Sequence, residues 1–179
     1  RWSIPHGGGA RGKRIQALID SIPQGVAGVQ LDYVRVPSDE EASAEKMDDI
    51  SHFVRTFSRM LRRARPGCAL SVAVFPTPEA AENRAQDWPR WVKEGWVDFV
   101  SPMIYTESTD AFKRDLALCS AVAPASAIVA GIAACADEAS PDRDSVRAQL
   151  EAADGLKGVS FFALDWALGA LCGHTDAMR

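Results

Sequence analysis

The sequence predicts an α/β protein built on a parallel sheet. Five short segments rich in Val, Ile, Phe and Ala recur at regular intervals, and each is followed by a turn and a plausible helix. Their apolar character is nearly continuous rather than alternating, as in strands that are buried on both faces of a parallel sheet. Strands that alternate with helices in this way define the α/β class.

The expected elements follow one another along the whole chain. The strands are 28–34, 69–75, 97–105, 127–134 and 158–166, and the helices are 11–22, 43–65, 110–122 and one from Ser140-Pro141 to about Asp154-Gly155. The helix at 43–65 has apolar residues at three- and four-residue spacing and stops at Pro66-Gly67. Its acidic start and basic end suit the helix dipole, so these charges need no ligand. His52 within it is expected at the surface or boundary.

Five strand-helix units are too few to close an eight-stranded barrel, which typically needs about 250 residues. They fit either part of a (β/α)8 barrel or an open five-stranded doubly wound parallel sheet. Periodicity alone leaves both open. The chain shows no internal repeat and no interdomain linker, so we treat 1–179 as a single domain.

Composition excludes several classes of function. The net charge is -4 and the charges are interspersed, so nucleic acid is not an expected partner. No apolar run approaches the roughly 20 residues that cross a bilayer, and the chain contains no signal peptide. The cysteines are widely spaced, which indicates buried free thiols, and the histidines are scattered. They are Cys68, Cys119, Cys135 and Cys172, with His6, His52 and His174. We therefore expect no protein-bound metal and no cofactor.

The glycine-rich start has the spacing of a phosphate-binding loop without its context. Gly7 to Lys13 reads GGGARGK, which fits GxxxxGK, but Arg14 stands where the motif needs Ser or Thr. The preceding residues are short and broken by proline, so no buried strand leads into the loop. A flexible glycine connection is the preferred interpretation.

The strongest candidate for chemistry is Asp32, within GVQLDYVRVP at 28–37. A carboxylate in an apolar strand loses its hydration, so it must be paired or used. The carboxyl ends of parallel strands open onto the functional crevice, and Asp32 is expected there. Arg35 is either its partner or a substrate contact, and a salt bridge or loop cap is the structural alternative for Asp32.

Three motifs in order carry a family resemblance. GVQLDYVRVP resembles the GIHxDYIRYP stretch of glycoside-hydrolase-like family 10, and residues 85–106 resemble its QDWxxWxxxGxxDxxxPMxY motif. The last strand, GVSFFALDW, is similar to its GxxLFSYDS stretch. Positions matching the second motif are Gln86, Asp87, Trp88, Trp91, Gly95, Asp98, Pro102, Met103 and Tyr105. The resemblance implies that the five strands are the fourth to eighth of a (β/α)8 barrel.

The resemblance also implies a glycosidase that acts on a polysaccharide, with bacterial cell-wall glycan as a plausible substrate, and favours a secreted or periplasmic location. Glycoside hydrolysis uses two carboxyl groups. Asp32 supplies the first, Asp165 is the preferred second by strand position, and Glu107 is the reserve. Asp98 starts its strand, so a structural role is expected. The oligomeric state is left open.

Several further residues are expected to bind the carbohydrate. Tyr105 closes its strand and suits contact with a sugar, whereas Trp91 and Trp96 are expected to pack between helix and barrel. The full set of expected substrate-binding residues is Tyr33, Arg35, Gln86, Trp88, Met103, Tyr105 and Trp166. Asp87 reads equally well as a helix N-cap. The alternative function is a non-catalytic carbohydrate-binding barrel.

Overall fold

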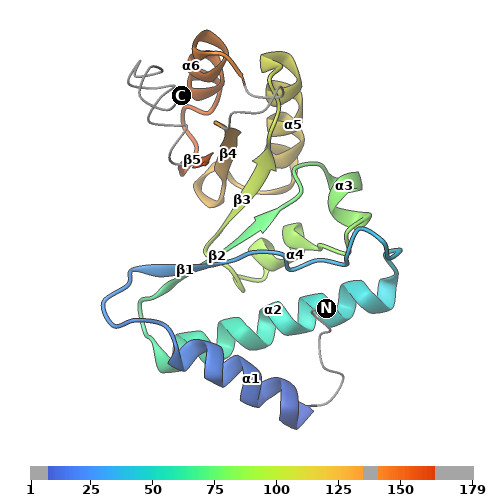
Figure 1. The fold of residues 1–179 in the computed structure, drawn as a ribbon, viewed down its shortest axis with the longest axis vertical. Helices are drawn as coiled ribbons and strands as arrows, with labels where there is room; N and C mark the ends of the chain where they lie inside the picture. Colours follow the sequence, from blue (N-terminus) through green and yellow to red (C-terminus); the bar gives the residue numbers. More distant parts are fainter. Residues whose placement is uncertain (1–7, 135–140, 164–179) are drawn as a thin grey trace, which may run out of the picture. The chain divides into compact units, whose positions relative to one another are not determined.

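The computed structural model describes residues 8–134 and 141–163, which form two compact units. Unit 1 comprises residues 1–74 and 79–100, and unit 2 comprises residues 75–78 and 101–179. Strands and helices alternate along the chain (Figure 1). The elements are α1 (Gly8–Asp20), β1 (Gly28–Leu31), α2 (Ala44–Ala64), β2 (Ala69–Val74), α3 (Pro78–Glu82), α4 (Trp88–Lys93), β3 (Phe99–Ile104), α5 (Thr109–Val122), a 3-10 turn (Ala125–Ala127), β4 (Val129–Ala133), α6 (Arg143–Ala152) and β5 (Gly158–Phe162).

In unit 1, β1 and β2 pair in parallel from Gly28 opposite Ala69 to Leu31 opposite Val72. The pair begins in a close approach of two backbones, because a Cβ added to Gly28 would lie 2.9 Å from the Ala69 carbonyl oxygen. No side chain tolerates that distance, which explains the glycine at this position. β2 is almost entirely buried, as predicted, whereas β1 alternates between exposed and half-buried residues.

The long helix α2 confirms its prediction from the sequence. Ser43 caps its N-terminus by accepting a hydrogen bond from the Lys46 amide at 3.2 Å. The buried face has the three- and four-residue spacing of an amphipathic helix, and His52 is exposed as expected. That face consists of Ile50, Phe53, Val54, Phe57 and Leu61.

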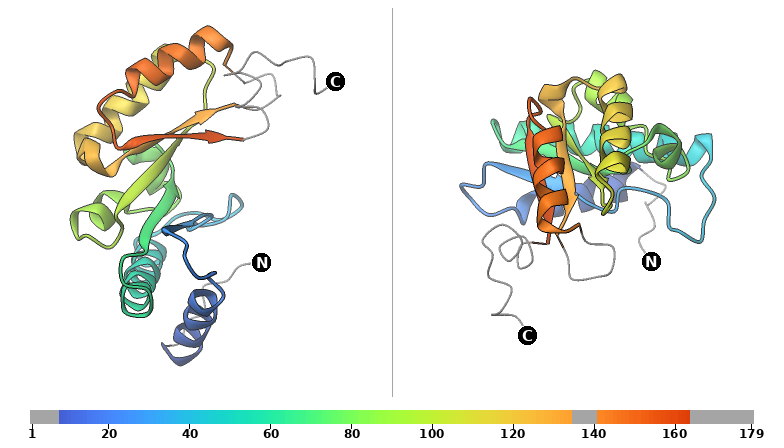
Figure 2. Two further views of the ribbon diagram at one scale, coloured as in Figure 1. Left: turned by 90° about the vertical axis from the view of Figure 1, so that its left-hand side faces the viewer. Right: turned by 90° about the horizontal axis from the view of Figure 1, so that it is seen from above.

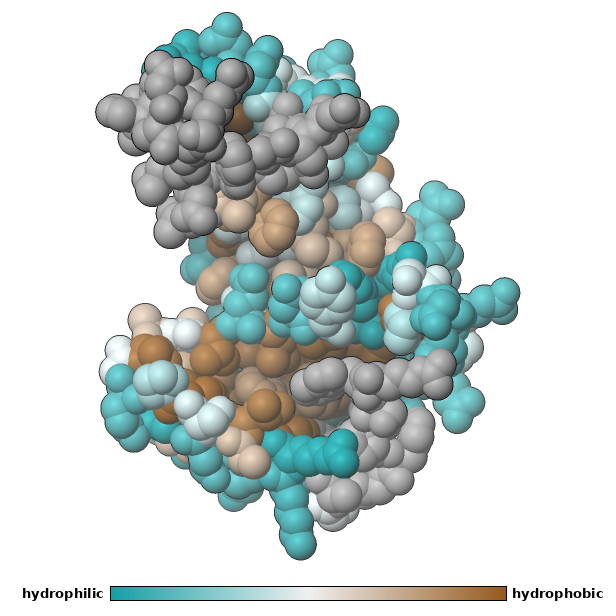
Figure 3. Space-filling model, in the orientation of Figure 1, coloured by the Kyte–Doolittle hydropathy of each residue, from teal (hydrophilic) through white to brown (hydrophobic). Residues whose placement is uncertain are grey.

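Helix α1 lies beside α2, as Figure 1 and the left view of Figure 2 show. It buries Ile15 and Ile19, four residues apart on one face. Because α1 starts at Gly8, most of the glycine-rich segment is helical. The expected flexible connection is therefore wrong from Gly8 onward, and a phosphate-binding loop is excluded over the same residues. Figure 3 shows apolar surface on the face of unit 1 that carries α1, α2 and β1, and exposed Leu18 and Val26 belong to this unit.

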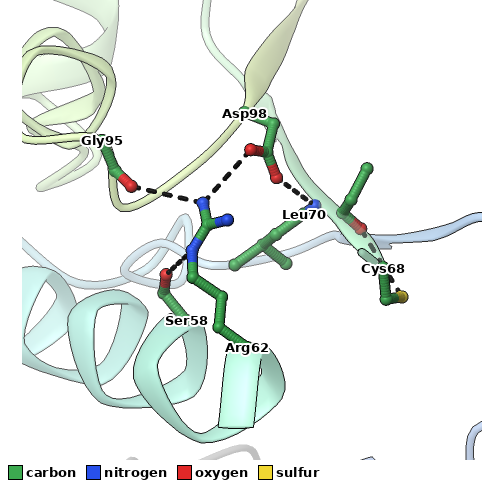
Figure 4. Close-up of polar contacts among 7 residues, drawn as sticks. Ser58, Arg62, Cys68, Leu70, Gly95 and Asp98 are labelled. Atoms are coloured by element: carbon green, nitrogen blue, oxygen red, sulfur yellow. Dashed lines mark hydrogen bonds and ion pairs between the residues drawn. The ribbon is translucent and has the colours of Figure 1, made fainter. Parts of the chain in front are cut away.

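Asp98 joins the start of β2 to the end of α2 (Figure 4). Its carboxylate accepts the Leu70 amide at 2.7 Å and the Arg62 guanidinium at 3.2 Å. The Asp98 amide in turn donates to the Leu70 carbonyl at 2.8 Å. Arg62 also donates to the Gly95 carbonyl at 3.3 Å and to the Ser58 hydroxyl at 3.3 Å. The predicted structural role of Asp98 is confirmed.

In unit 2, β4 lies between β3 and β5, and all three strands are parallel. Met103 pairs with Gly131, and the β4–β5 register runs from Val129 opposite Gly158 to Ala133 opposite Phe162. Helix α6 starts two residues later than the Ser140-Pro141 signal predicts. Asp142 is the N-cap, since its carboxylate accepts the Ser145 amide at 2.7 Å. Ser140 lies outside the described residues.

The strand order separates the two predicted architectures. In both units the strands follow one another in chain order. A doubly wound sheet reverses its strand order at a switch point, whereas a (β/α)8 barrel keeps the chain order throughout. The fold is that of part of a (β/α)8 barrel. Each strand is shorter than predicted, and residues 164–166 of the last prediction lie outside the described part.

Candidate functional site

Asp32 directly follows the last residue of β1 and is exposed. Its Oδ1 accepts the amide of Tyr33 at 2.6 Å. The chain turns sharply here, because the Arg35 amide donates to the Tyr33 carbonyl at 2.9 Å. The position at a strand end agrees with the sequence analysis, but the expected burial of this carboxylate in an apolar strand is wrong. β1 ends before Asp32, which leaves its side chain in solvent.

Tyr33 has a strained backbone and an exposed ring. Its φ of 57° lies in the left-handed region, a conformation that is unfavourable for residues other than glycine. Residues strained in this way are found more often at functional sites than elsewhere. The side chain is 75% exposed, and the guanidinium carbon of Arg35 lies 4.1 Å from the centroid of its ring. This distance fits a cation–π contact. Tyr33 and Arg35 therefore form one surface feature beside Asp32.

Gln86 holds the segment that follows Asp32. Its side chain is 2% exposed, and its Nε2 donates to the Val34 carbonyl at 3.0 Å and to the Ala73 carbonyl at 3.4 Å. The amide thus ties the turn after β1 to the end of β2. Such contacts give Gln86 a structural role and leave little of it accessible to a substrate.

The tryptophans of the second motif are packing residues. Trp88 is fully buried, so its ring offers no face to a sugar, and its expected role in substrate binding is wrong in this structure. Trp91 is equally buried and donates from Nε1 to the Ser51 hydroxyl at 2.9 Å, as its predicted packing role requires. Asp87 occupies the N-cap position of α4 without a capping hydrogen bond from its side chain. Burial raises the pKa of the Asp87 carboxyl, an effect that the nearby Arg90 partly offsets.

Two aromatic rings form an exposed platform at the carboxyl ends of β3 and β5. Tyr105 follows the last residue of β3, and Phe162 ends β5. Their ring centroids are 5.5 Å apart with planes inclined by 22°, and the residues are 45% and 57% exposed. We call Tyr105 and Phe162 the aromatic pair. Phe162 was not among the predicted site residues.

Gly131 of β4, the strand between them, makes room for the aromatic pair. A Cβ at this position would lie 3.2 Å from Cε1 of Tyr105 and 2.7 Å from the Pro102 carbonyl oxygen. The ring of Tyr105 therefore lies over the glycine, where any side chain would displace it. Large aromatic faces with polar edges suit contact with the apolar faces of sugar rings.

The loop after β3 carries the reserve carboxylate. Glu107 is exposed, and Ser108 caps α5 by accepting the Ala111 amide at 3.2 Å. Thr106 between Tyr105 and Glu107 accepts the Ser108 amide on its hydroxyl at 3.2 Å. Met103 is half-buried within β3. Asp165 and Trp166 lie outside the described residues.

Within residues 8–134 and 141–163, no group of three His, Cys, Asp or Glu side chains is placed to hold a metal ion. Cys68 and Cys119 are free and buried, as expected. Cys135, Cys172, His6 and His174 lie outside the described residues. Among the described helices, none combines the length and apolar character needed to cross a membrane.

Known structures share the fold of this chain. The spore cortex-lytic enzyme SleL of Bacillus cereus superposes with a TM-score of 0.68 at 14% identity, over 90% of this chain and 51% of SleL. A chitinase from Chromobacterium violaceum gives 0.63 at 18% identity, over 87% of this chain and 66% of the enzyme. The chitinase-like agglutinin RobpsCRA of Robinia pseudoacacia gives 0.59 at 14% identity, over 90% and 74%. The chain thus spans about half the length of SleL. The shared fold is the (β/α)8 barrel, of which this chain forms part.

Residues 30–130, more than half of the chain, match the family described as Glycosyl hydrolase-like 10. The chain belongs to this family, as the three motifs predicted. A comparison with curated protein sequences gives no match. Family membership supports a carbohydrate-active protein.

Proposed function

We propose that this chain is part of a glycoside hydrolase that cleaves a polysaccharide, with bacterial cell-wall glycan as the first substrate to test. The family match carries the proposal. Two features of the described residues support it: an exposed carboxylate, Asp32, at the carboxyl end of β1, and an exposed aromatic pair at the carboxyl ends of β3 and β5. In (β/α)8 barrels the strands' carboxyl ends carry the catalytic residues.

Asp32 supplies one of the two carboxyl groups that glycoside hydrolysis requires, and Asp165 or Glu107 supplies the other. One group protonates the leaving oxygen while the second acts as nucleophile or base. The aromatic pair binds an apolar face of the sugar, and the hydroxyl of Tyr105 contacts a polar substituent. Tyr33 and Arg35 extend the binding surface next to Asp32.

The test compares hydrolysis by the wild-type protein and by Asp32→Asn, with peptidoglycan glycan strands and a panel of polysaccharides. Asparagine keeps an oxygen that accepts the Tyr33 amide, so the turn after β1 is preserved while the ionisable group is removed. Loss of a general acid or base lowers the rate by roughly 10²- to 10⁴-fold. Asp39→Asn, at an exposed carboxylate seven positions further along, is the matched control and is expected to keep full activity. Unchanged hydrolysis by Asp32→Asn contradicts the assignment.

A non-catalytic carbohydrate-binding barrel is the second candidate. The observation in its favour is that Asp32 Oδ1 already serves the turn by accepting the Tyr33 amide, while the aromatic pair suits binding alone. This function predicts a measurable dissociation constant by calorimetry for a glycan that the wild-type protein does not hydrolyse. Turnover that Asp32→Asn abolishes rejects it.

A further inference from the structure

A buried glutamine of α6 reaches the loop that carries Tyr105 and Glu107. Gln149 is 0% exposed, and its Nε2 donates to the Thr106 carbonyl at 2.9 Å. Thr106 is the residue between Tyr105 and Glu107. Helices α5 and α6 lie side by side (Figure 1), so the bond joins the second of these helices to the segment that leads into the first. It links residues that are 43 positions apart in the chain.

The oxygen of the Gln149 amide, in contrast to its nitrogen, makes no hydrogen bond to a described residue. Gln149 Oε1 is buried, and no described residue donates a hydrogen bond to it. A buried polar atom without a partner loses its hydration, which costs more free energy than an average hydrogen bond contributes. An apolar side chain of similar volume would pack α6 at least as well. The stability of the helix packing therefore does not explain a glutamine at this position.

The bond instead acts on the geometry of the loop. The Thr106 carbonyl belongs to the peptide unit between Thr106 and Glu107, which is joined through the Thr106 Cα to the peptide unit between Tyr105 and Thr106. Fixing this group restricts the ψ angle of Thr106 and the backbone of its neighbours. The Tyr105 ring lies over Gly131 and stacks on Phe162, and Glu107 directly follows the peptide that Gln149 holds. Both side chains depend on the peptide that Gln149 holds.

We propose that Gln149 is a positioning residue that fixes the Tyr105–Glu107 loop at the expense of stability. It keeps the Tyr105 ring on Phe162 and sets the direction of the Glu107 carboxylate. The relevance of this loop to sugars rests on the proposed function. The positioning itself does not, and it can be measured without any sugar.

The experiment uses ¹⁹F NMR of the purified protein labelled with 3-fluorotyrosine, and Tyr105→Phe identifies the Tyr105 resonance by removing it. The test variant is Gln149→Met, which keeps the side-chain length but removes the donor. Its Tyr105 resonance is expected to shift or broaden while that of Tyr33 stays in place. Its urea midpoint is expected to stay close to that of the wild type, because removal of the unpaired Oε1 offsets the hydrogen bond that the Thr106 carbonyl loses. The exposed residue Glu151 on the same helix supplies the control, Glu151→Gln, for which neither resonance moves.

A glycan titration then separates this inference from the proposed function. If the wild-type protein binds a glycan, Gln149→Met is expected to raise the dissociation constant about tenfold, because the binding loop is less well ordered before the glycan binds. A tenfold change corresponds to the free energy of about one hydrogen bond. If the wild type binds none, the proposed function fails and the NMR result still stands.

Three outcomes overturn the positioning role. One is a Tyr105 resonance that does not move in Gln149→Met. Another is a movement of both tyrosine resonances together with a lower urea midpoint, because that pattern describes a general packing residue. The third is failure of both Gln149→Met and Gln149→Leu to fold, since the proposal requires that the protein remain folded without this glutamine.

Discussion

Replacing Asp98 tests how one carboxylate supports unit 1 through two different interactions. Asp98→Ala removes the acceptor of the Leu70 amide, and Leu70 is only 1% exposed. A buried donor left without a partner costs about 1–3 kcal/mol. The ion pair with Arg62 contributes less, about 0–1 kcal/mol, because the two side chains are 37% and 44% exposed and solvent screens their attraction.

Asp98→Asn separates these two terms. The asparagine oxygen still accepts the Leu70 amide, so only the ion pair is weakened. We expect Asp98→Ala to lose about 2–3 kcal/mol in the free energy of unfolding, and Asp98→Asn to lose less than about 1 kcal/mol. For a chain of this size the alanine variant then melts roughly 4–12 °C below the wild type.

Thermal and urea denaturation, each followed by circular dichroism, measure both losses. The measurement is repeated in about 1 M NaCl, where the screening length falls to about 3 Å. Salt should shrink the ion-pair part of the deficit in both variants, so that the deficit of Asp98→Asn nearly disappears, whereas most of the deficit of Asp98→Ala should persist because an unpaired amide is not screened. Equal losses for the two variants, or an alanine deficit that disappears in salt, would refute the reasoning.

Three further predictions follow from other contacts. Gly131→Ala should lower the free energy of unfolding by about 1–3 kcal/mol, since its Cβ would lie 2.7 Å from the Pro102 carbonyl oxygen. It should also weaken glycan binding by displacing Tyr105. A urea midpoint equal to that of the wild type contradicts the expected clash. The Ser145 amide lowers the pKa of the Asp142 carboxyl below its ordinary value of 3.8, so the charged carboxylate stabilises the fold at any pH above 3.8. This contribution disappears as the pH falls through the lowered pKa. Asp142→Ala should therefore be less stable than the wild type at pH 7, and the difference in unfolding free energy should narrow in acid. Burial raises the pKa of the Cys119 thiol to about 12, so iodoacetamide should alkylate it at pH 8 only after unfolding, and rapid labelling of the native protein would contradict the burial.

The regular parts of the fold follow from the sequence because their signals are local. The apolar period of α2 and the stop at Pro66-Gly67 give nearly the observed helix of Ala44–Ala64. Strand ends are less predictable. β1 stops at Leu31 because the Tyr33 amide bonds to the Asp32 carboxylate and Tyr33 adopts a positive φ, neither of which apolar patterning reveals.

Helix α6 illustrates a second limit. Ser140-Pro141 and Asp142 are both good start signals, and the choice depends on which side chain reaches an amide three residues on. The structure shows that Asp142 does so.

For the candidate site, the sequence predicts correctly that Asp32 and Tyr105 lie at strand ends. It could not show which way Trp88 faces, because residue type alone does not distinguish a buried indole from one available for stacking. Phe162 was missed because a phenylalanine in an apolar strand looks like a core residue.

The hydrogen bonds of Gln86 have a consequence for protein engineering. One buried amide from the second motif holds the Val34 carbonyl, two residues after Asp32 in the first motif. Segment 32–36 is therefore not an independent module. A loop exchange that transplants it into another barrel must carry a residue equivalent to Gln86 with it, and a shuffled library that separates the two should recover few folded clones with an intact turn.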